Sequence, residues 1–240
     1  MHRTPVLLAA ALLLACADSS RDLVVRVSMP GADSVEAPVP EVRVLALPYD
    51  RDSVREALAA AAPAERPRAA EAELDSLFAL YREPFTAFVL ASNRADRLAD
   101  TLTALEQDAN AAALADVRAR LAATRERREH ARAELETVRT AIGPRVDSLR
   151  ARVQLWEHTA FQDWSTEVAQ LGRGRREPRA DTTGPHGLAR LQVPGGDWWI
   201  HATAHDPLDP NGRWYWNVPV PAEGDTIRLD ARTGTRRARY

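Results

Sequence analysis

Two histidines four positions apart, His201 and His205, are the side chains best suited to bind a metal ion. Imidazole nitrogens are common zinc ligands, but both rings must reach the same ion. The alternation of apolar and polar residues around them predicts a β-strand, in which four residues span about 13 Å. We therefore expect neither a metal site nor any other cofactor.

Asp206, Asp209 and Asn211 follow at a spacing that resembles part of a calcium loop. They lack the rest of such a loop and its terminal Glu. Asp and Asn beside Pro are also common turn formers, and we adopt that interpretation. The sequence has no His-Glu-x-x-His motif, no Gly-rich phosphate loop and no Ser-His-Asp order, so we predict no catalytic residues and no enzyme activity.

Four tryptophans gather in this part of the chain, at Trp198, Trp199, Trp214 and Trp216. Alternation places Trp198 and Trp199 on opposite faces of their strand, and it places Trp214 and Trp216 on one face of their own strand. An outward row of Trp199, Trp214 and Trp216 could bind a ligand by stacking on a sugar, or it could be the floor on which helices dock. We favour docking, because exposed aromatic patches of this size are rare.

A single cysteine, Cys16, follows a short apolar run that begins after Arg3. A basic residue, about ten apolar residues and a small residue before a cleavage point are typical of an export signal. Such a run is too short to span a bilayer as a stable anchor. Because the chain has no other cysteine, we expect no disulfide and no thiolate metal site.

The segment Leu13-Leu14-Ala15-Cys16 resembles the lipobox of bacterial lipoproteins. The resemblance implies that residues 1–15 are a signal peptide and that acyl chains on Cys16 hold the protein on membrane lipid. It also implies a place in the cell envelope, where Ala17, in place of Asp after the cysteine, favours the outer membrane facing the periplasm. An ordinary secretory signal with an incidental cysteine is the alternative.

The elements that position these residues begin with strands at both ends of the chain. Period-two alternation predicts strands at 23–28, 41–47, 188–193, 198–205, 213–218 and 226–230. The segment Pro194 to Asp197 predicts a hairpin turn. Because a lone hairpin is not stable in water, we expect strands from both ends to form one sheet system. Residues 231–240 are expected to be a basic, frayed tail.

This pattern is similar to that of carboxypeptidase regulatory-like domains, a family of transthyretin-like β-sandwiches. The features that correspond to the family's motifs are the turn Thr183 to Gly187, the inward positions Ala189 and Leu191, the segment Val193 to Gly196, and Trp198. The resemblance implies an antiparallel sandwich that serves as a non-catalytic accessory module.

About 130 residues between these strands carry a helical pattern instead. Apolar residues recur every three or four positions over 74–89, 98–112 and 114–142, and the last stretch is typical of a coiled coil or a long bundle helix. We expect a kink or restart at Pro84, a break at Gly143-Pro144 and a hairpin tip at Asp108-Ala109-Asn110. The polar residues Thr124 and Arg128 favour packing within one chain over a tight dimeric zipper.

A shorter helix precedes these, with Asp52 or Ser53 as its N-cap and an end before Pro63. From Gly172 to Gly184 the chain is rich in Arg, Gly and Pro, which predicts a flexible return to the sheet. Because the insertion must come back to the sandwich, we expect an antiparallel helical hairpin.

The predicted class is α+β. The expected parts are a signal peptide over 1–15, a tether over 16–22, an antiparallel transthyretin-like β-sandwich from 23–50 and 181–240, and an α-helical insertion over 51–180. A net charge of −2 with interspersed signs excludes a nucleic-acid-binding surface.

The predicted function is a non-catalytic binding or scaffolding module that is tethered to the envelope and binds a protein partner through the helical insertion. Two alternatives stay open. One is a carbohydrate-binding lipoprotein that uses the outward tryptophans, and the other is a periplasmic adaptor of a transport complex.

Overall fold

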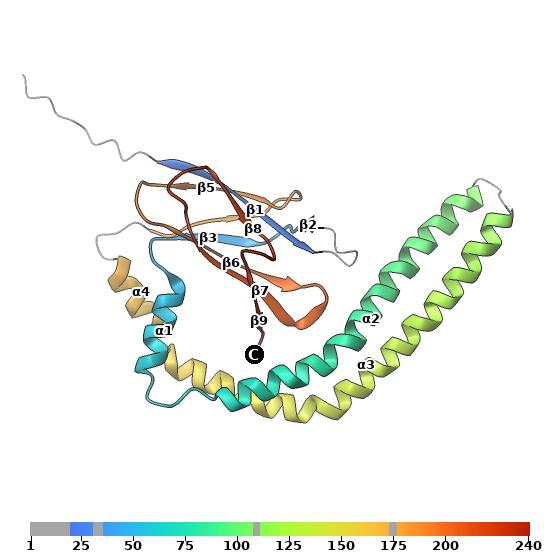
Figure 1. Cartoon of the computed structure of the whole chain (residues 1–240), viewed down its shortest axis with the longest axis horizontal. Helices are drawn as coiled ribbons and strands as arrows, with labels where there is room; N and C mark the ends of the chain where they lie inside the picture. The colour runs from blue at the N-terminus through green and yellow to red at the C-terminus, as the bar shows by residue number, and fades with distance from the viewer. Residues whose placement is uncertain (1–19, 31–35, 108–110, 173–176) are drawn as a thin grey trace, which may run out of the picture.

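The computed structural model describes residues 20–30, 36–107, 111–172 and 177–240. Strands from both ends of the chain form two packed sheets, and a long pair of helices extends away from them (Figure 1). The protein is therefore mixed α and β, with the helices between the strands in sequence, as predicted. Cys16 and the rest of the predicted signal peptide and lipobox lie outside the described residues.

Each sheet draws strands from both ends of the chain. The first sheet contains β1 (Arg21–Pro30), β2 (Glu36–Pro38), β5 (Leu188–Val193) and β8 (Thr226–Leu229). The second contains, in spatial order, β4 (Arg179–Thr182), β3 (Arg43–Leu47), β6 (Trp199–Asp206), β7 (Asp209–Pro219) and β9 (Thr235–Ala238). Neighbouring strands run antiparallel except β1 and β8, which are parallel, so among the described strands the predicted all-antiparallel arrangement has one exception.

The two sheets share one apolar core. Val25 and Val44 reach it from the early strands, and Ile200, Trp216 and Leu229 from the late ones, and all five are fully buried. Alternate residues along each strand point to this core because side chains in a strand alternate between its two faces.

The hairpin predicted around Pro194 to Asp197 is wrong. β5 pairs with β1, whereas β6 pairs with β3 and β7, so the connection crosses from one sheet to the other. Each of the two strands has one apolar face, and both faces are buried when the strands lie in opposite layers of the core. The indole N–H of Trp198 donates to the Pro194 carbonyl (2.8 Å) at the crossing.

The turn Thr183 to Gly187 joins late and early parts of the sandwich. The buried Thr183 hydroxyl donates to the Val39 carbonyl (2.7 Å) and accepts from the Val42 N–H (2.9 Å). Gly187 has φ 68°, and a Cβ there would lie 2.5 Å from the Val27 carbonyl oxygen. Glycine is required at this position because both the backbone angle and the close approach exclude a side chain.

The inserted helices are α1 (Arg51–Ala61), α2 (Arg68–Gln107), α3 (Ala111–Ala160) and α4 (Trp164–Gly172). The break predicted at Gly143-Pro144 is wrong, and α2 continues through Pro84 without a restart. Both prolines lie inside helices that are packed along each other, and this packing outweighs the lost hydrogen bond at each proline. The predicted tip, Asp108-Ala109-Asn110, lies outside the described residues.

We call α2 and α3 the arm. Its root is a cluster in which Leu74 and Phe78 of α2 pack against Leu149 and Val153 of α3. A second cluster, the distal core, contains Ala95, Leu98, Val117 and Leu121. The predicted packing within one chain is therefore observed. With 50 residues, α3 is about 75 Å long.

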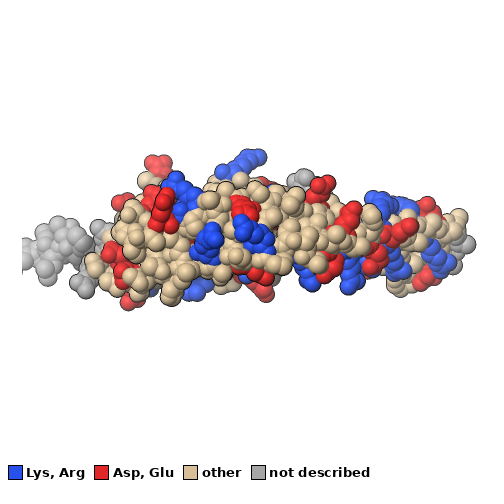
Figure 2. Space-filling view, turned by 90° about the horizontal axis from the view of Figure 1, so that it is seen from below, with Lys and Arg blue, Asp and Glu red and all other residues tan. Residues whose placement is uncertain are grey.

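The two polar residues that interrupt the apolar pattern of α3 have partners within the arm. Thr124 is buried between the helices, and its hydroxyl donates to the Arg120 carbonyl (2.7 Å), while Arg128 reaches Glu129 (2.9 Å). Figure 2 shows basic and acidic side chains interspersed along the arm on the face it presents. Part of the predicted flexible return is ordered, because Arg179–Thr182 form the edge strand β4.

Candidate functional site

The arm root meets the sandwich at the outer face of β6, β7 and β9. Alternation turns His201, Thr203, Arg213, Tyr215 and Arg237 to this face, opposite the sandwich core. α1 and the end of α3 cover the face and leave a cavity of about 510 Å³ between helices and sheet. Polar and aromatic side chains line this cavity, and we take the junction as the candidate functional site.

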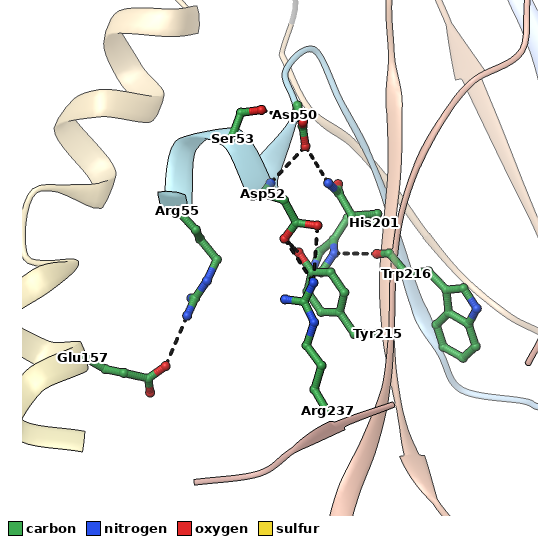
Figure 3. A network of polar contacts seen from close by, with 10 residues as sticks. Asp50, Asp52, Ser53, Arg55, Glu157, His201, Tyr215, Trp216 and Arg237 are labelled. Carbon is green, nitrogen blue, oxygen red and sulfur yellow. Dashed lines mark hydrogen bonds and ion pairs between the residues drawn. The ribbon is translucent and has the colours of Figure 1, made fainter. Parts of the chain in front are cut away.

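Asp50 fixes the N-terminus of α1 on the sheet (Figure 3). Its carboxylate accepts hydrogen bonds from the Asp52 backbone N–H (3.0 Å), the Ser53 hydroxyl (2.6 Å) and the Asn217 side-chain amide on β7 (2.6 Å). Partial burial acts to raise the pKa of Asp50, but these hydrogen bonds bring it below its ordinary value. The N-cap is therefore Asp50, and the prediction of Asp52 or Ser53 is wrong.

Asp52 makes a second link between α1 and the sheet. The Tyr215 hydroxyl donates to its Oδ1 (2.7 Å), and Nη2 of Arg237 lies 3.3 Å from both carboxylate oxygens. The Arg237 guanidinium also covers the Tyr215 ring, 3.4 Å from its centroid. Burial, and next the hydrogen bond to Asp52, raises the pKa of Tyr215 to about 12, so the hydroxyl remains a donor at neutral pH.

His201 is buried under α1, beside this network (Figure 3). Its Nδ1 lies 2.9 Å from the Trp216 carbonyl oxygen, which can only accept, so Nδ1 carries the proton. Burial, and next the positive charge of Arg51, lowers the pKa of His201 to about 4. The ring is therefore neutral near pH 7. His205, on the same strand, is exposed and lies 3.3 Å from Arg239.

The end of α3 closes the cavity from the other side. Arg55 of α1 lies 3.1 Å from Glu157 of α3, and its guanidinium covers the Phe161 ring at 4.1 Å. The Trp156 indole N–H donates to the Ala64 carbonyl (2.9 Å) in the connection between α1 and α2. α1 is thus held both to the sheet and to the arm.

A second contact between arm and sandwich forms at the turn between β6 and β7. The Asp209 carboxylate is buried and lies 2.9 Å from Arg82 of α2 and 2.8 Å from Arg236 of β9, which also pairs with Asp206 (2.6 Å). Asp206 and Asp209 also accept hydrogen bonds from backbone N–H groups two residues later, each 2.9 Å long. These residues of the suggested calcium-like spacing thus form turns and ion pairs.

A third contact comes from the tail, so the prediction that it is frayed is wrong. Thr235–Ala238 form β9, which pairs with β7, and the Arg239 N–H donates to the Asn211 carbonyl (2.7 Å). The Tyr240 ring stacks on Phe78 of the arm root with centroids 6.5 Å apart. Its hydroxyl donates to Asp75 (3.1 Å). The tail is ordered because it bridges the sheet and the root.

The predicted outward row of Trp199, Trp214 and Trp216 does not form. Trp216 is fully buried in the sandwich core, and Trp214 stacks on it with centroids 6.2 Å apart. Their partners on β6 are Ala202 and Ala204, and these small residues leave room for two indoles on the inner face. Of the three, only Trp199 lies on the helix-facing side of the sheet.

Trp199 lines a separate, mostly apolar pocket of about 580 Å³ between α1, α4 and the sheet. Val54 and Leu58 of α1 and Leu171 of α4 form much of its wall. Asp197 and Glu167 also line it. The helices here are α1 and α4, so the arm itself does not dock on a tryptophan surface.

Sequence reasoning missed the arginines and the tyrosine of the junction. Arg213, Tyr215 and Arg237 occupy outward strand positions, which is the signal that could have placed them on one face once the pairing of β7 and β9 was known. Within the described residues, no three His, Cys, Asp or Glu side chains are grouped so that they could hold a metal ion.

Comparison with known protein families, with curated protein sequences and with solved structures found no match to this chain. None of the described helices combines the length and apolarity needed to cross a bilayer.

Proposed function

We propose that this protein is a non-catalytic envelope lipoprotein that holds a rigid helical arm out from a β-sandwich for a protein partner. The observation that carries the proposal is how the arm is attached. Its root is joined to the sandwich through α1, through Asp209 and through the tail at Tyr240. Beyond the root the arm projects away from the sandwich (Figure 1).

Three separate attachments fix the direction of the arm. The entropic cost of closing a loop rises slowly with its length, so a long insertion is tolerated without contacts to the rest of the fold. A helical pair that only filled a loop would therefore not need these attachments. The distal core is built from the arm's own residues, so the outer surface of the helices is left for recognition.

The lipid anchor is proposed from residues 1–16. We expect the intact mass of the protein purified from membranes to exceed that of the chain cut before Cys16 by the mass of its acyl chains, because two or three chains give lasting attachment. A Cys16→Ser variant should lack the added mass and leave the membrane fraction. A variant that stays on the membrane with unchanged mass would contradict the anchor.

The arm is tested by shortening it. We expect that replacing residues 91–129 with a short Gly-Ser linker, which removes the distal core but keeps the root, leaves a cooperative thermal transition by circular dichroism. The same variant should lose the partner recovered by crosslinking the native lipoprotein in cells. The control carries the same linker in place of residues 108–110, so that both helices keep their described length.

Two results would argue against this function. A shortened protein that no longer melts cooperatively would mean that the arm completes the fold of the sandwich. Capture of the same partner by the shortened protein would place its binding site on the root or the sandwich.

The identity of the captured protein also tests the adaptor alternative, which requires a component of a transport complex. The carbohydrate alternative depended on three outward indoles. Because Trp216 is fully buried and Trp214 stacks on it, that platform is lost, and we do not propose sugar binding on these residues.

A further inference from the structure

More arginines line the cavity at the junction than form ion pairs with carboxylates of its wall. The arginines that line it are Arg51, Arg55, Arg66, Arg213 and Arg237. Three of them have carboxylate partners in the cavity wall: Arg55 pairs with Glu157 (3.1 Å), Arg66 with Glu71 (2.9 Å) and Arg237 with Asp52 (3.3 Å). Arg51 and Arg213 are left without an ion pair among the residues that the structure describes.

Arg213 is the less compensated of these two cations. Its cross-strand partner on the same face is Arg237, and like charges opposite each other on a sheet repel. Its Nε is shielded from solvent and has no hydrogen-bond partner in the described part of the chain. Burial lowers the pKa of the Arg213 guanidinium. The charge of Glu157 comes next and acts against this, and the nearby Arg55, Arg237 and Arg239 lower the pKa again.

Arg51 adds a second unsatisfied group. Its Nε is also shielded without a partner, and its guanidinium lies 4.6 Å from the Trp164 ring centroid. Buried donors left unsatisfied cost free energy, so such groups in a cavity point to a missing acceptor. Arginine forks match carboxylate and phosphate oxygens, which accept two parallel hydrogen bonds.

We propose that this cavity binds a small-molecule oxyanion, carried as a carboxylate or a phosphate, with Arg213 as its main cationic ligand. The site is additional to the partner-binding function of the arm and does not depend on it. A volume of about 510 Å³ suits a small organic anion. Trp156, Phe161 and Tyr240 line the same cavity and give the rest of the molecule apolar surface.

The surrounding arginines are held in place before any ligand arrives. Phe161 supports the face of Arg55, and Tyr215 supports the face of Arg237. Side chains that are already ordered lose less entropy when a ligand binds. Because their charges are matched by Glu157 and Asp52, the positive charge open to a ligand is that of Arg213 and Arg51, offset in part by the Glu56 carboxylate, which also lines the cavity.

The test uses the full chain in detergent, with inorganic phosphate and succinate as separate probes and succinamide as the neutral match, all at constant ionic strength. We expect at least one oxyanion, but not succinamide, to raise the melting temperature and to give a calorimetric binding curve. Arg213→Gln should weaken that binding at least about tenfold, because hydrogen bonds to charged groups are the stronger ones. Without a probe, Arg213→Gln should melt no lower than the parent protein, because the unpaired charge is removed.

Arg139→Gln is the control for charge. Arg139 is exposed on the arm and pairs only with Glu136 among the described residues, so this variant should bind the probe like the parent protein. Which probe binds distinguishes a phosphate ligand from a carboxylate ligand. The proposal is overturned if neither oxyanion binds at millimolar concentration, if Arg213→Gln binds as tightly as the parent, or if Arg213→Gln melts lower without any probe.

Discussion

Replacing Trp216 with alanine is expected to lower the free energy of unfolding by about 3–5 kcal/mol. The indole is fully buried, stacks on Trp214 and donates its N–H to the Asp230 carbonyl (2.9 Å). The ring also lies close to the chain, since a Cβ on Gly234 would be 2.4 Å from its Nε1. The substitution therefore leaves a cavity and removes one hydrogen bond to the Asp230 carbonyl, which still accepts from the Gly234 N–H (2.9 Å). Urea unfolding followed by far-ultraviolet circular dichroism measures the loss.

Trp199→Ala is the matched control. Trp199 is partly exposed and lies outside the sandwich core. Its replacement should therefore lower the free energy of unfolding much less than the replacement of Trp216. Equal losses from the two substitutions would contradict the assignment of Trp216 to the core and Trp199 to the helix-facing side of the sheet.

Stability is expected to fall between about pH 6.5 and about pH 4 because of His201. The folded protein holds this ring neutral down to about pH 4, whereas the unfolded chain takes up a proton near the ordinary pKa of 6.5. The contribution of the neutral His201 ring to the free energy of unfolding is complete above pH 6.5, decreases as pH falls and is gone below about pH 4. A pKa difference of this size corresponds to a change on the order of 3 kcal/mol.

Burial is the largest cause of the lowered pKa of His201, and the groups around the ring modify it. Arg51 of α1 and Arg237 of β9 disfavour a second positive charge, while Asp52 and the hydrogen bond to the Trp216 carbonyl act against them. His201→Asn should flatten the dependence of the free energy of unfolding on pH in this range. His205→Asn, at an exposed position of the same strand, should leave it unchanged. If the pH dependence of the free energy of unfolding persists in His201→Asn, another titratable group causes it.

Local patterns predicted the elements well and their partners poorly. The three-and-four spacing from Leu114 to Ile142 gave a long helix that packs within its own chain, and alternation gave the inward positions Ala189 and Leu191. The same alternation at β5 and β6 fits a hairpin or two opposed layers equally well. The choice depends on which other strands bury each apolar face, and β1, β3 and β7 lie far away in sequence.

The junction was harder to predict than the fold. Arg213 and Arg237 face the same cavity only because β9 pairs with β7. The tail that contains β9 has four arginines in a short segment, a composition that is typical of an unstructured end. The position of Trp216 depended on Ala202 and Ala204, which make room for it on the neighbouring strand. The spacing of residues within one segment does not reveal which strands pair with each other, and these positions depend on that pairing.

The arm also has a consequence for how the sheets close. β3 and β4 pair although about 130 residues separate them, and bringing the ends of so long a loop together is slow and entropically costly. Helices form quickly from nearby contacts, so once α2 and α3 have paired, the part of this loop that remains to be closed shrinks to about 40 residues in total. That lowers the closure cost by roughly 1 kcal/mol. The segment that separates the two halves of the sandwich in sequence is therefore also the one that brings them together during folding.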